Sequence, residues 1–288
     1  MLYRHPKDWV KNLKRFGGYV RYMKMLGNQK KMKNAAYSLP VVNSFQNGLP
    51  VYFLTGKKYI HQTLFCINSL CRVCNERLKF ILVDDGSFDT QLIDLVKSKV
   101  TGAEIITSAM VDKNLREQLP ADRYPVLHQK RGEYPHIKKL TDIHTLNKGW
   151  KMVLDSDMLF WREPLEVISW LKNPHQNIFM KDCIESYGYS INLMQTLCGN
   201  EITRKINVGL IGLNSDEISW EKLEEWCDVL EKIEGTSYYL EQALTAMLVA
   251  GSDFNHDVVK RIRKGMAERL GSCVSIDVEI VDDIPSEA

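Results

Sequence analysis

Five short apolar runs divide the middle of the chain, and polar or glycine-containing turns bound each of them. The runs lie at 51–54, 80–83, 103–106, 150–154 and 206–213. Their length and their content of β-branched and aromatic residues are typical of buried β-strands. We therefore expect these five segments to form the sheet around which the protein folds.

Segments with a helical spacing of apolar residues lie between and after these runs. They cover roughly 60–71, 92–96, 164–171, 216–234 and 239–250. Strands that alternate with helices along a chain favour a parallel sheet wound with right-handed crossovers. The pattern therefore predicts an α/β fold, with a Rossmann-like and mainly parallel sheet flanked by helices.

Three stretches depart from this rhythm and suggest how the chain is organised. Residues 111–136 are polar and contain three prolines, so we expect a long irregular loop, which in a compact domain is usually functional. Residues 1–45 are basic and helical in pattern. Residues 255–288 combine a basic helix with a clean alternation of apolar and polar positions, typical of a half-buried strand. We therefore expect an N-terminal segment, a main domain at 46–254 and a short C-terminal αβ appendage.

The overall charge of the chain excludes few classes of function, but the charged residues are unevenly distributed along it. A net charge of +2, with 26% charged and 44% hydrophobic residues, is ordinary for a soluble globular protein and requires no nucleic-acid partner. Residues 1–33, however, hold ten lysines and arginines against one acidic residue, Asp8. One interpretation is a solvated helix packed on the domain. The other is an amphipathic contact with an anionic membrane surface.

The cellular setting follows from what the sequence lacks. It contains no apolar run long enough to span a bilayer and no signal-peptide pattern at its start. Its seven scattered cysteines suit a reducing compartment, and Cys71-x-x-Cys74 has no second pair, so buried thiols are expected rather than a zinc site. We expect a cytoplasmic protein, with peripheral attachment to the inner face of the membrane as an extension of that hypothesis.

Distinctive polar groups follow three of the predicted strands. They are Thr55-Gly56, Asp84-Asp85-Gly86-Ser87 and Asp155-Ser156-Asp157. In open α/β sheets, ligands bind just beyond the carboxyl ends of the strands. If the three strands are parallel neighbours, these groups converge on one crevice, and the sequence predicts a ligand site there.

The third group has the chemistry of a metal site. Asp155 and Asp157 lie two residues apart at a strand end and can share one hard cation, either Mg²⁺ or Mn²⁺. Such a cation neutralises the negative charge that develops when a nucleoside diphosphate departs. The alternative is an acidic turn with solvated side chains, because an isolated D-x-D is common by chance.

Four segments, in this order, resemble the GT-A glycosyltransferases, especially the group of glycogenin and the bacterial lipopolysaccharide sugar transferases. Residues 51–87, ending in Val83-Asp84-Asp85-Gly86-Ser87, are similar to the nucleotide-binding half. Residues 150–157 resemble the D-x-D strand, and 206–214 (INVGLIGLN) resemble the acceptor-side strand. Glu241-Gln242 resembles the acidic-Gln pair of the same group. The resemblance covers roughly residues 50–250 and implies a metal-dependent glycosyltransferase.

The resemblance also implies partners and roles. The donor would be a nucleotide sugar, most simply a UDP-sugar, and the acceptor a glycan or lipid-linked sugar in surface polysaccharide biosynthesis. Asp157 would be the main ligand of Mn²⁺ or Mg²⁺, shared with Asp155. The remaining donor contacts implied are Thr55, Asp84, Asp85, Lys138 or Lys139, Asp155 and Asn207. Glu241 and Gln242 would face the transferred sugar, Glu241 as a base in an inverting enzyme and Gln242 in a retaining one.

Two features depart from the family pattern. The glycogenin group has a metal-binding His near the end of the catalytic domain, followed by Gly and Lys, and His256 does not lie in such a context. The stretch 269–285 instead resembles the end of adenylate-forming ligases of the phenylacetate–CoA ligase type, as a fused or truncated reading frame would produce. Two alternatives therefore stay open: a nucleotidyltransferase that makes a nucleotide sugar, and a GT-A remnant that binds nucleotide without turnover.

Overall fold

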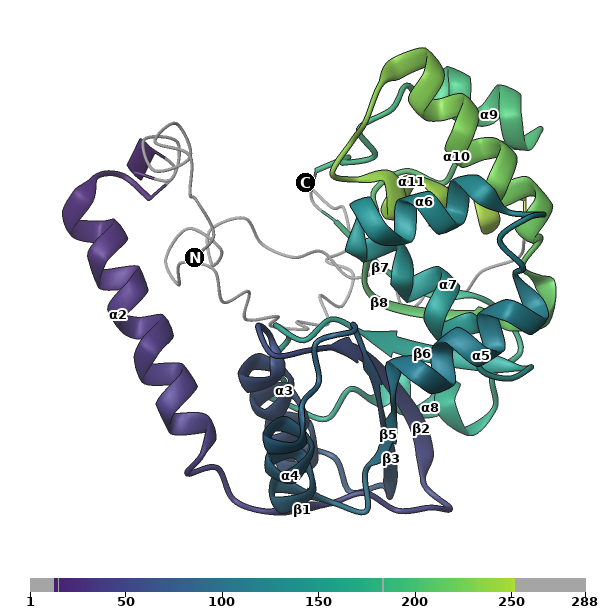
Figure 1. The fold of residues 1–288 in the computed structure, drawn as a ribbon. Helices are drawn as coiled ribbons and strands as arrows, with labels where there is room; N and C mark the ends of the chain where they lie inside the picture. The colour runs from purple at the N-terminus through teal and green to yellow at the C-terminus, as the bar shows by residue number, and fades with distance from the viewer. Residues whose placement is uncertain (1–12, 15, 183, 252–288) are drawn as a thin grey trace, which may run out of the picture.

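The computed structural model describes residues 13–14, 16–182 and 184–251 (Figure 1). The strands are β1 (Val42–Asn43), β2 (Leu49–Thr55), β3 (Leu78–Asp84), β4 (Val100–Thr101), β5 (Glu104–Ile106), β6 (Trp150–Leu154), β7 (Ile178–Lys181) and β8 (Ile206–Asn214). The helices before β6 are α2 (Tyr19–Ala36), α3 (Ile60–Val73), α4 (Thr90–Lys99), α5 (Ser108–Gln118), α6 (Pro125–Glu133), the short 3₁₀ helix η1 (Pro135–Ile137) and α7 (Lys138–His144). Those after it are α8 (Leu165–Lys172), α9 (Ile191–Cys198), η2 (Ser215–Glu217), α10 (Trp220–Glu234) and α11 (Leu240–Leu248).

The main sheet has six strands in the order β5-β3-β2-β6-β8-β7. The first four are parallel to one another, whereas β8 runs antiparallel to both β6 and β7. The predicted α/β fold with a mainly parallel sheet is therefore confirmed. Because β8 is reversed, its first residues lie at the same edge of the sheet as the carboxyl ends of its neighbours.

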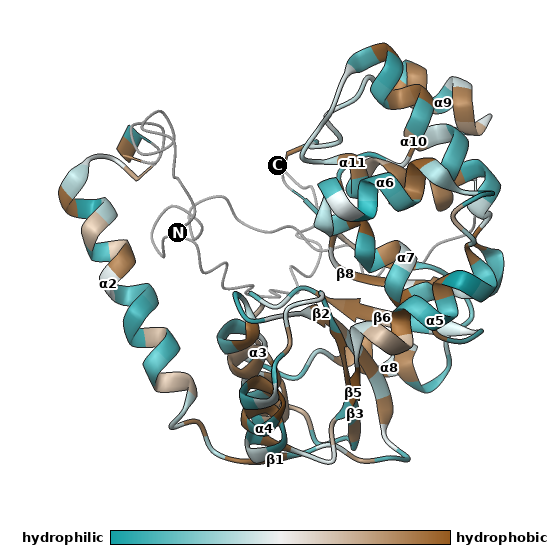
Figure 2. Cartoon of the chain, in the orientation of Figure 1, coloured by the Kyte–Doolittle hydropathy of each residue, from teal (hydrophilic) through white to brown (hydrophobic). Residues whose placement is uncertain are grey.

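Alternation along the central strands gives the sheet two apolar faces. On β2 and β3, Phe53 and Phe80 are buried with α3, α4 and α8, whereas Tyr52 and Ile81 are buried with α5, α6, α7, α10 and α11. Helices therefore cover both sides of the sheet, and Figure 2 shows the strands as a hydrophobic layer between them. Within the described part of the chain, no helix is long and apolar enough to cross a bilayer.

The prediction of an irregular loop at 111–136 was wrong, because α5, α6 and η1 occupy that region. Val111, Leu115 and Leu119 are fully or almost fully buried at a spacing of four residues. This narrow apolar stripe is enough to dock a helix, but the polar residues on either side of it give the segment the look of a loop in sequence. Strand β7 and helix α9 were also absent from the sequence-based expectations.

The two ends of the chain are described only in part. Helix α2 lies within the expected N-terminal segment, and it contacts α3 at the body of the domain. Tyr19, Val20 and Met23 of α2 are exposed, and every charged residue of this helix is basic. The expected αβ appendage at 255–288 lies outside the described residues.

Candidate active site

The predicted convergence of the strand ends rests on the register of the sheet. Thr55 of β2 lies directly opposite Asp84 of β3. The Thr55 hydroxyl lies 2.7 Å from the Thr63 hydroxyl, which donates to Ser156 Oγ at 2.9 Å, in the centre of the D-x-D turn. Thr55 is 1% exposed, so it supports the turn from beneath instead of facing solvent.

Asp84 organises the loop that follows β3. Its Oδ1 accepts hydrogen bonds from the backbone N–H groups of Gly86, Ser87 and Phe88 at 2.7, 2.9 and 3.0 Å. Its Oδ2 accepts a further bond from the N–H of Ser108 at 3.2 Å. A carboxylate with four backbone donors is fixed in place, and Asp84 therefore shapes the loop from within.

Asp85 is the more accessible member of the pair. Its Oδ1 accepts bonds from the N–H and hydroxyl of Ser87, at 3.0 and 2.5 Å, and its backbone carbonyl accepts from Lys138 Nζ at 2.6 Å. The carboxylate lies so close to Gly56 that a Cβ there would come within 2.0 Å of Oδ1. Only glycine at position 56 allows Asp85 this position.

Asp155 is placed by β8 and by a buried lysine. Its N–H donates to the carbonyl of Gly209 at 2.7 Å, and its Oδ1 accepts from Lys139 Nζ at 2.9 Å. The same ammonium lies 3.3 Å from Glu241 Oε2 and also donates to the carbonyl of Val208. One buried cation therefore joins the D-x-D turn to the head of α11.

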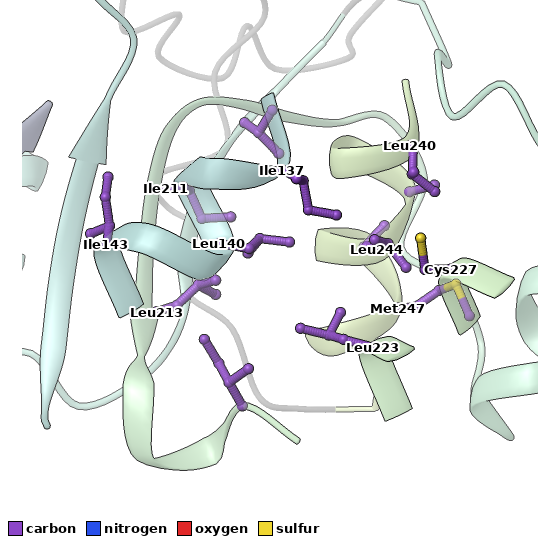
Figure 3. Packing of buried hydrophobic residues seen from close by; sticks show 14 of the residues in the cluster. Ile137, Leu140, Ile143, Ile211, Leu213, Leu223, Cys227, Leu240, Leu244 and Met247 are labelled. Carbon is purple, nitrogen blue, oxygen red and sulfur yellow. The ribbon is translucent and has the colours of Figure 1, made fainter. Parts of the chain in front are cut away.

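Apolar packing brings these charged groups together. Leu140 of α7 directly follows the lysine of the ion pair, Leu240 of α11 directly precedes the glutamate, and both leucines are buried in the core that Figure 3 shows. Leu244 of α11 and Ile211 of β8 line the same core. Since α7, β8 and α11 meet in this core, the charged residues beside these leucines are held at the site edge.

The site has an excess of negative charge. Burial, and then the charge of Asp155, raises the pKa of Asp157 from 3.8 to about 6. Burial raises the pKa of Glu241 from 4.5 to about 7, although Lys139 lowers it. Burial alone would lower the pKa of Lys139, but Asp155 and Glu241 outweigh this effect and raise it. Lys139 is therefore charged, and in the described ranges no cationic side chain forms an ion pair with Asp157.

This donor set suits a cation with incomplete protein ligation. Across the residues that the structure describes, no three His, Cys, Asp or Glu side chains gather closely enough to enclose a metal ion. Two carboxylates on one turn instead match Mg²⁺ or Mn²⁺, which keep positions for water and phosphate oxygens. A cation bound at this turn would favour the ionised form of Asp157 and so lower its raised pKa.

Asn207 and Gln242 complete the predicted set. Asn207, in the second position of β8, accepts a bond from the N–H of Gly209 at 2.8 Å and donates to Asp182 Oδ2 at 3.2 Å. Gln242 is buried, and its Nε2 has no hydrogen-bond partner within the described chain. A buried amide of this kind has donor capacity left for a ligand or for water.

An aromatic cluster beside the site was missed by the sequence analysis. Tyr134 and His136 lie in the region predicted as a loop, and Tyr238 and Tyr239 directly precede α11. Their rings form a chain of contacts with centroid distances of 5.1–5.3 Å. The pair Tyr238-Tyr239 beside Glu241 was the available signal, but aromatic residues at a helix start are usually assigned to the core.

Comparisons with known proteins reveal likeness at the level of structure. No family model and no curated protein matches the sequence. Mouse xyloside xylosyltransferase 1 matches with a TM-score of 0.44 and 12% identity, over 72% of this chain and 82% of that chain. The galactosyltransferase LgtC, in complex with donor and acceptor sugar analogues, matches at 0.45 and 13%, over 74% and 73%. The mannosyltransferase Ktr4p of S. cerevisiae matches at 0.42 and 11%, over 83% and 78%.

All three similar structures are glycosyltransferases by description, which is the class that the sequence motifs resemble. Because the TM-scores lie below 0.5, we base the function of this chain on its own residues.

Proposed function

We propose that this protein is a glycosyltransferase that uses a nucleotide-sugar donor and a divalent metal. The observation that carries the proposal is the meeting of the D-x-D turn with Lys139 and Glu241 at the carboxyl ends of parallel strands. This edge of an open α/β sheet is where nucleotide ligands bind. Its carboxylates are suited to hold a divalent cation, which would supply the positive charge that departure of a nucleoside diphosphate requires.

The donor diphosphate would lie between a metal ion and the buried lysine. Asp157 would be the principal protein ligand of Mn²⁺ or Mg²⁺, and Asp155 would share its carboxylate between that ion and Lys139. The metal would supply neutralisation of the diphosphate leaving group. Lys139 is held in its charged form by its two acidic neighbours, and it would add a fixed positive charge from helix α7.

The nucleoside would lie over the ends of β2 and β3. Asp85 is the carboxylate available to hydrogen-bond a ribose or base, since Asp84 already accepts four backbone bonds and the Thr55 side chain is buried. We therefore refine the set of donor contacts: Asp85 touches the nucleoside, while Thr55 and Asp84 hold the backbone that receives it. A UDP-sugar is the donor we propose.

Glu241, Gln242 and Asn207 would face the transferred sugar. In an inverting reaction Glu241 would accept the proton of the acceptor hydroxyl, and its pKa of about 7 matches that task near neutral pH. In a retaining reaction the unpartnered amide of Gln242 would contact the sugar instead. The anomeric configuration of the product, read by NMR, distinguishes the two.

The proposed acceptor is a glycan or a lipid-linked sugar of surface polysaccharide biosynthesis. The basic helix α2, with Tyr19, Val20 and Met23 exposed, is the element that we propose to contact an anionic membrane where such acceptors lie. Binding of α2-containing protein to vesicles with and without anionic lipid tests this contact.

One observation weighs against the nucleotidyltransferase alternative. Such an enzyme needs a glycine-rich loop open to triphosphate soon after its first strand. Here the Asp85 carboxylate covers Gly56, and Lys57 is paired with Asp89 at 2.6 Å. An anionic side chain over the loop repels phosphate, so the geometry favours the transferase.

The experiment that tests the function is calorimetric titration of UDP-, GDP- and ADP-sugars with and without Mn²⁺. The wild type and Asp157→Asn are compared. Tight binding of one donor that needs both Mn²⁺ and Asp157 supports the proposal, and slow metal-dependent hydrolysis of that donor distinguishes an active enzyme from a remnant. Release of pyrophosphate from a nucleoside triphosphate would instead identify a nucleotidyltransferase.

A further inference from the structure

Tyr238 is an aromatic side chain that the protein leaves in solvent beside its charged site. It is 68% exposed, although it lies only two residues before Leu240, the buried first residue of α11. Scattered exposed apolar residues are common and need no explanation. Tyr238 differs because its neighbours fix both its backbone and its ring.

The backbone of this segment is fixed by two contacts. The Tyr134 hydroxyl donates to the carbonyl oxygen of Tyr238 at 2.5 Å. Beneath the segment, Gly188 packs so closely that a Cβ there would lie 1.9 Å from Ser237 Oγ, and its φ of +71° also favours glycine. The loop before α11 therefore presents Tyr238 in a defined position.

The ring is held by two neighbouring aromatic side chains. His136 lies edge-on to it, with a centroid distance of 5.1 Å and an interplanar angle of 74°. Tyr239 contacts it at 5.3 Å and 87°. These edge contacts are favourable arrangements of aromatic pairs, and they restrain the ring without covering it.

Two contacts between the same two segments of the chain place Tyr238 relative to the site. His136 and Tyr238 touch through their rings, and three residues later in each segment Lys139 and Glu241 form an ion pair at 3.3 Å. The aromatic contact therefore lies beside the ion pair, and it is the more exposed of the two.

The chemistry of this arrangement suits a sugar ring. A pyranose has an apolar face of C–H groups and a rim of hydroxyls, so its recognition needs a flat aromatic surface beside hydrogen-bonding polar groups. Tyrosine supplies such a surface at low conformational cost, with a polar tip. The carboxylate of Glu241, beside this surface, can accept a hydrogen bond from a sugar hydroxyl.

We propose that Tyr238, flanked by His136 and Tyr239, binds the pyranose ring of the acceptor sugar; this inference rests on the proposed function. The acceptor is then a glycan, free or carried on a lipid, and its terminal sugar stacks on Tyr238 with one hydroxyl directed towards Glu241. The nucleoside of the donor lies elsewhere, over the ends of β2 and β3.

The test is saturation-transfer NMR with methyl glycosides of galactose, glucose, mannose and xylose, in the presence of UDP and the diamagnetic cation Mg²⁺. We expect at least one glycoside to bind through one C–H face. Tyr238→Ala should weaken that binding by about tenfold or more, and Tyr238→Trp should retain it. Tyr37→Ala removes an equally exposed tyrosine at the end of α2 and should change nothing.

Calorimetry of UDP with Mn²⁺, on the same variants, separates this inference from the proposed function. Unchanged UDP affinity in Tyr238→Ala, together with lost glycoside binding, supports an acceptor subsite. Unchanged glycoside binding in that variant overturns it, as does loss of UDP binding alone, which would assign the ring to the nucleoside. A wild type that binds UDP but none of the glycosides also overturns the inference and leaves the proposed function standing, whereas failure to bind any nucleotide rejects the proposed function itself.

Discussion

Asp157 is the carboxylate for which the native fold and the proposed activity have opposite requirements, and Asp157→Asn separates them. The fold raises its pKa from 3.8 to about 6 because the side chain is partly buried beside Asp155. A carboxyl group with a raised pKa stabilises the native state below pH 3.8, and this contribution is lost as the pH rises to about 6. Above pH 6 the charged side chain therefore carries its full penalty.

The magnitude follows from the size of that change. At about 1.36 kcal/mol per pKa unit, a rise from 3.8 to about 6 corresponds to at most about 3 kcal/mol. Asp157 keeps some contact with solvent, so we expect about 1–3 kcal/mol. Asparagine removes the charge at nearly constant volume. Asp157→Asn should therefore raise the Tm at pH 7.5 by about 3–9 °C and have little effect at pH 4.

The assay is thermal unfolding at both pH values, with and without Mn²⁺. Ligand binding to the native state raises the Tm by mass action, so Mn²⁺ with UDP should stabilise the wild type and leave Asp157→Asn unchanged. The matched control is Asp155→Asn, which weakens the hydrogen bond from Lys139 and should cost about 1 kcal/mol. A lower Tm for Asp157→Asn than for wild type at pH 7.5 would refute the reasoning, because it would mean that the native fold stabilises this charge.

Three further substitutions test other parts of the site and the core. Lys139→Met leaves Glu241 buried without its cation and should lower the free energy of unfolding by about 3 kcal/mol in urea denaturation; an unchanged midpoint would contradict the buried ion pair. Gly56→Ala displaces the carboxylate of Asp85 and should weaken nucleotide binding by about tenfold, with a loss of stability below about 1 kcal/mol, by calorimetry and thermal unfolding. Burial lowers the pKa of Lys151 from 10.5 to about 8, so its charge destabilises the fold below pH 8 and this penalty disappears as the pH rises to 10.5. Lys151→Met should therefore raise the free energy of unfolding at pH 7 by about 1–3 kcal/mol relative to wild type. If this difference between variant and wild type were the same at pH 7 and at pH 10.5, it would argue against a buried charge.

The sheet and the strand ends could be predicted because their signals are local. A run such as Phe80–Val83 followed at once by two aspartates defines both a buried strand and the polar group at its end. Parallel pairing of β2 with β3 and β6 then brings those groups to one edge. The reversed direction of β8 was not predicted, since nothing in an apolar run shows which way it enters a sheet.

The contacts that define the site chemically could not be predicted in the same way. Lys139 and Glu241 are separated by about a hundred residues, and only the core shared by α7, β8 and α11 makes them neighbours. Sequence also could not tell Lys138 from Lys139. The structure directs Lys138 to the carbonyl of Asp85 and Lys139 to the carboxylates of Asp155 and Glu241.

The reversed strand β8 has a consequence for the segment that connects it to β7. Strand β7 ends and β8 begins at the site edge, so the whole of 182–205 leaves the sheet and returns to it beside Asn207. Helix α9 lies within this segment and packs against α10 and α11, outside the six-stranded sheet. Gly188 of this segment packs against Ser237, so the excursion that returns beside Asn207 also supports the backbone that carries Tyr238.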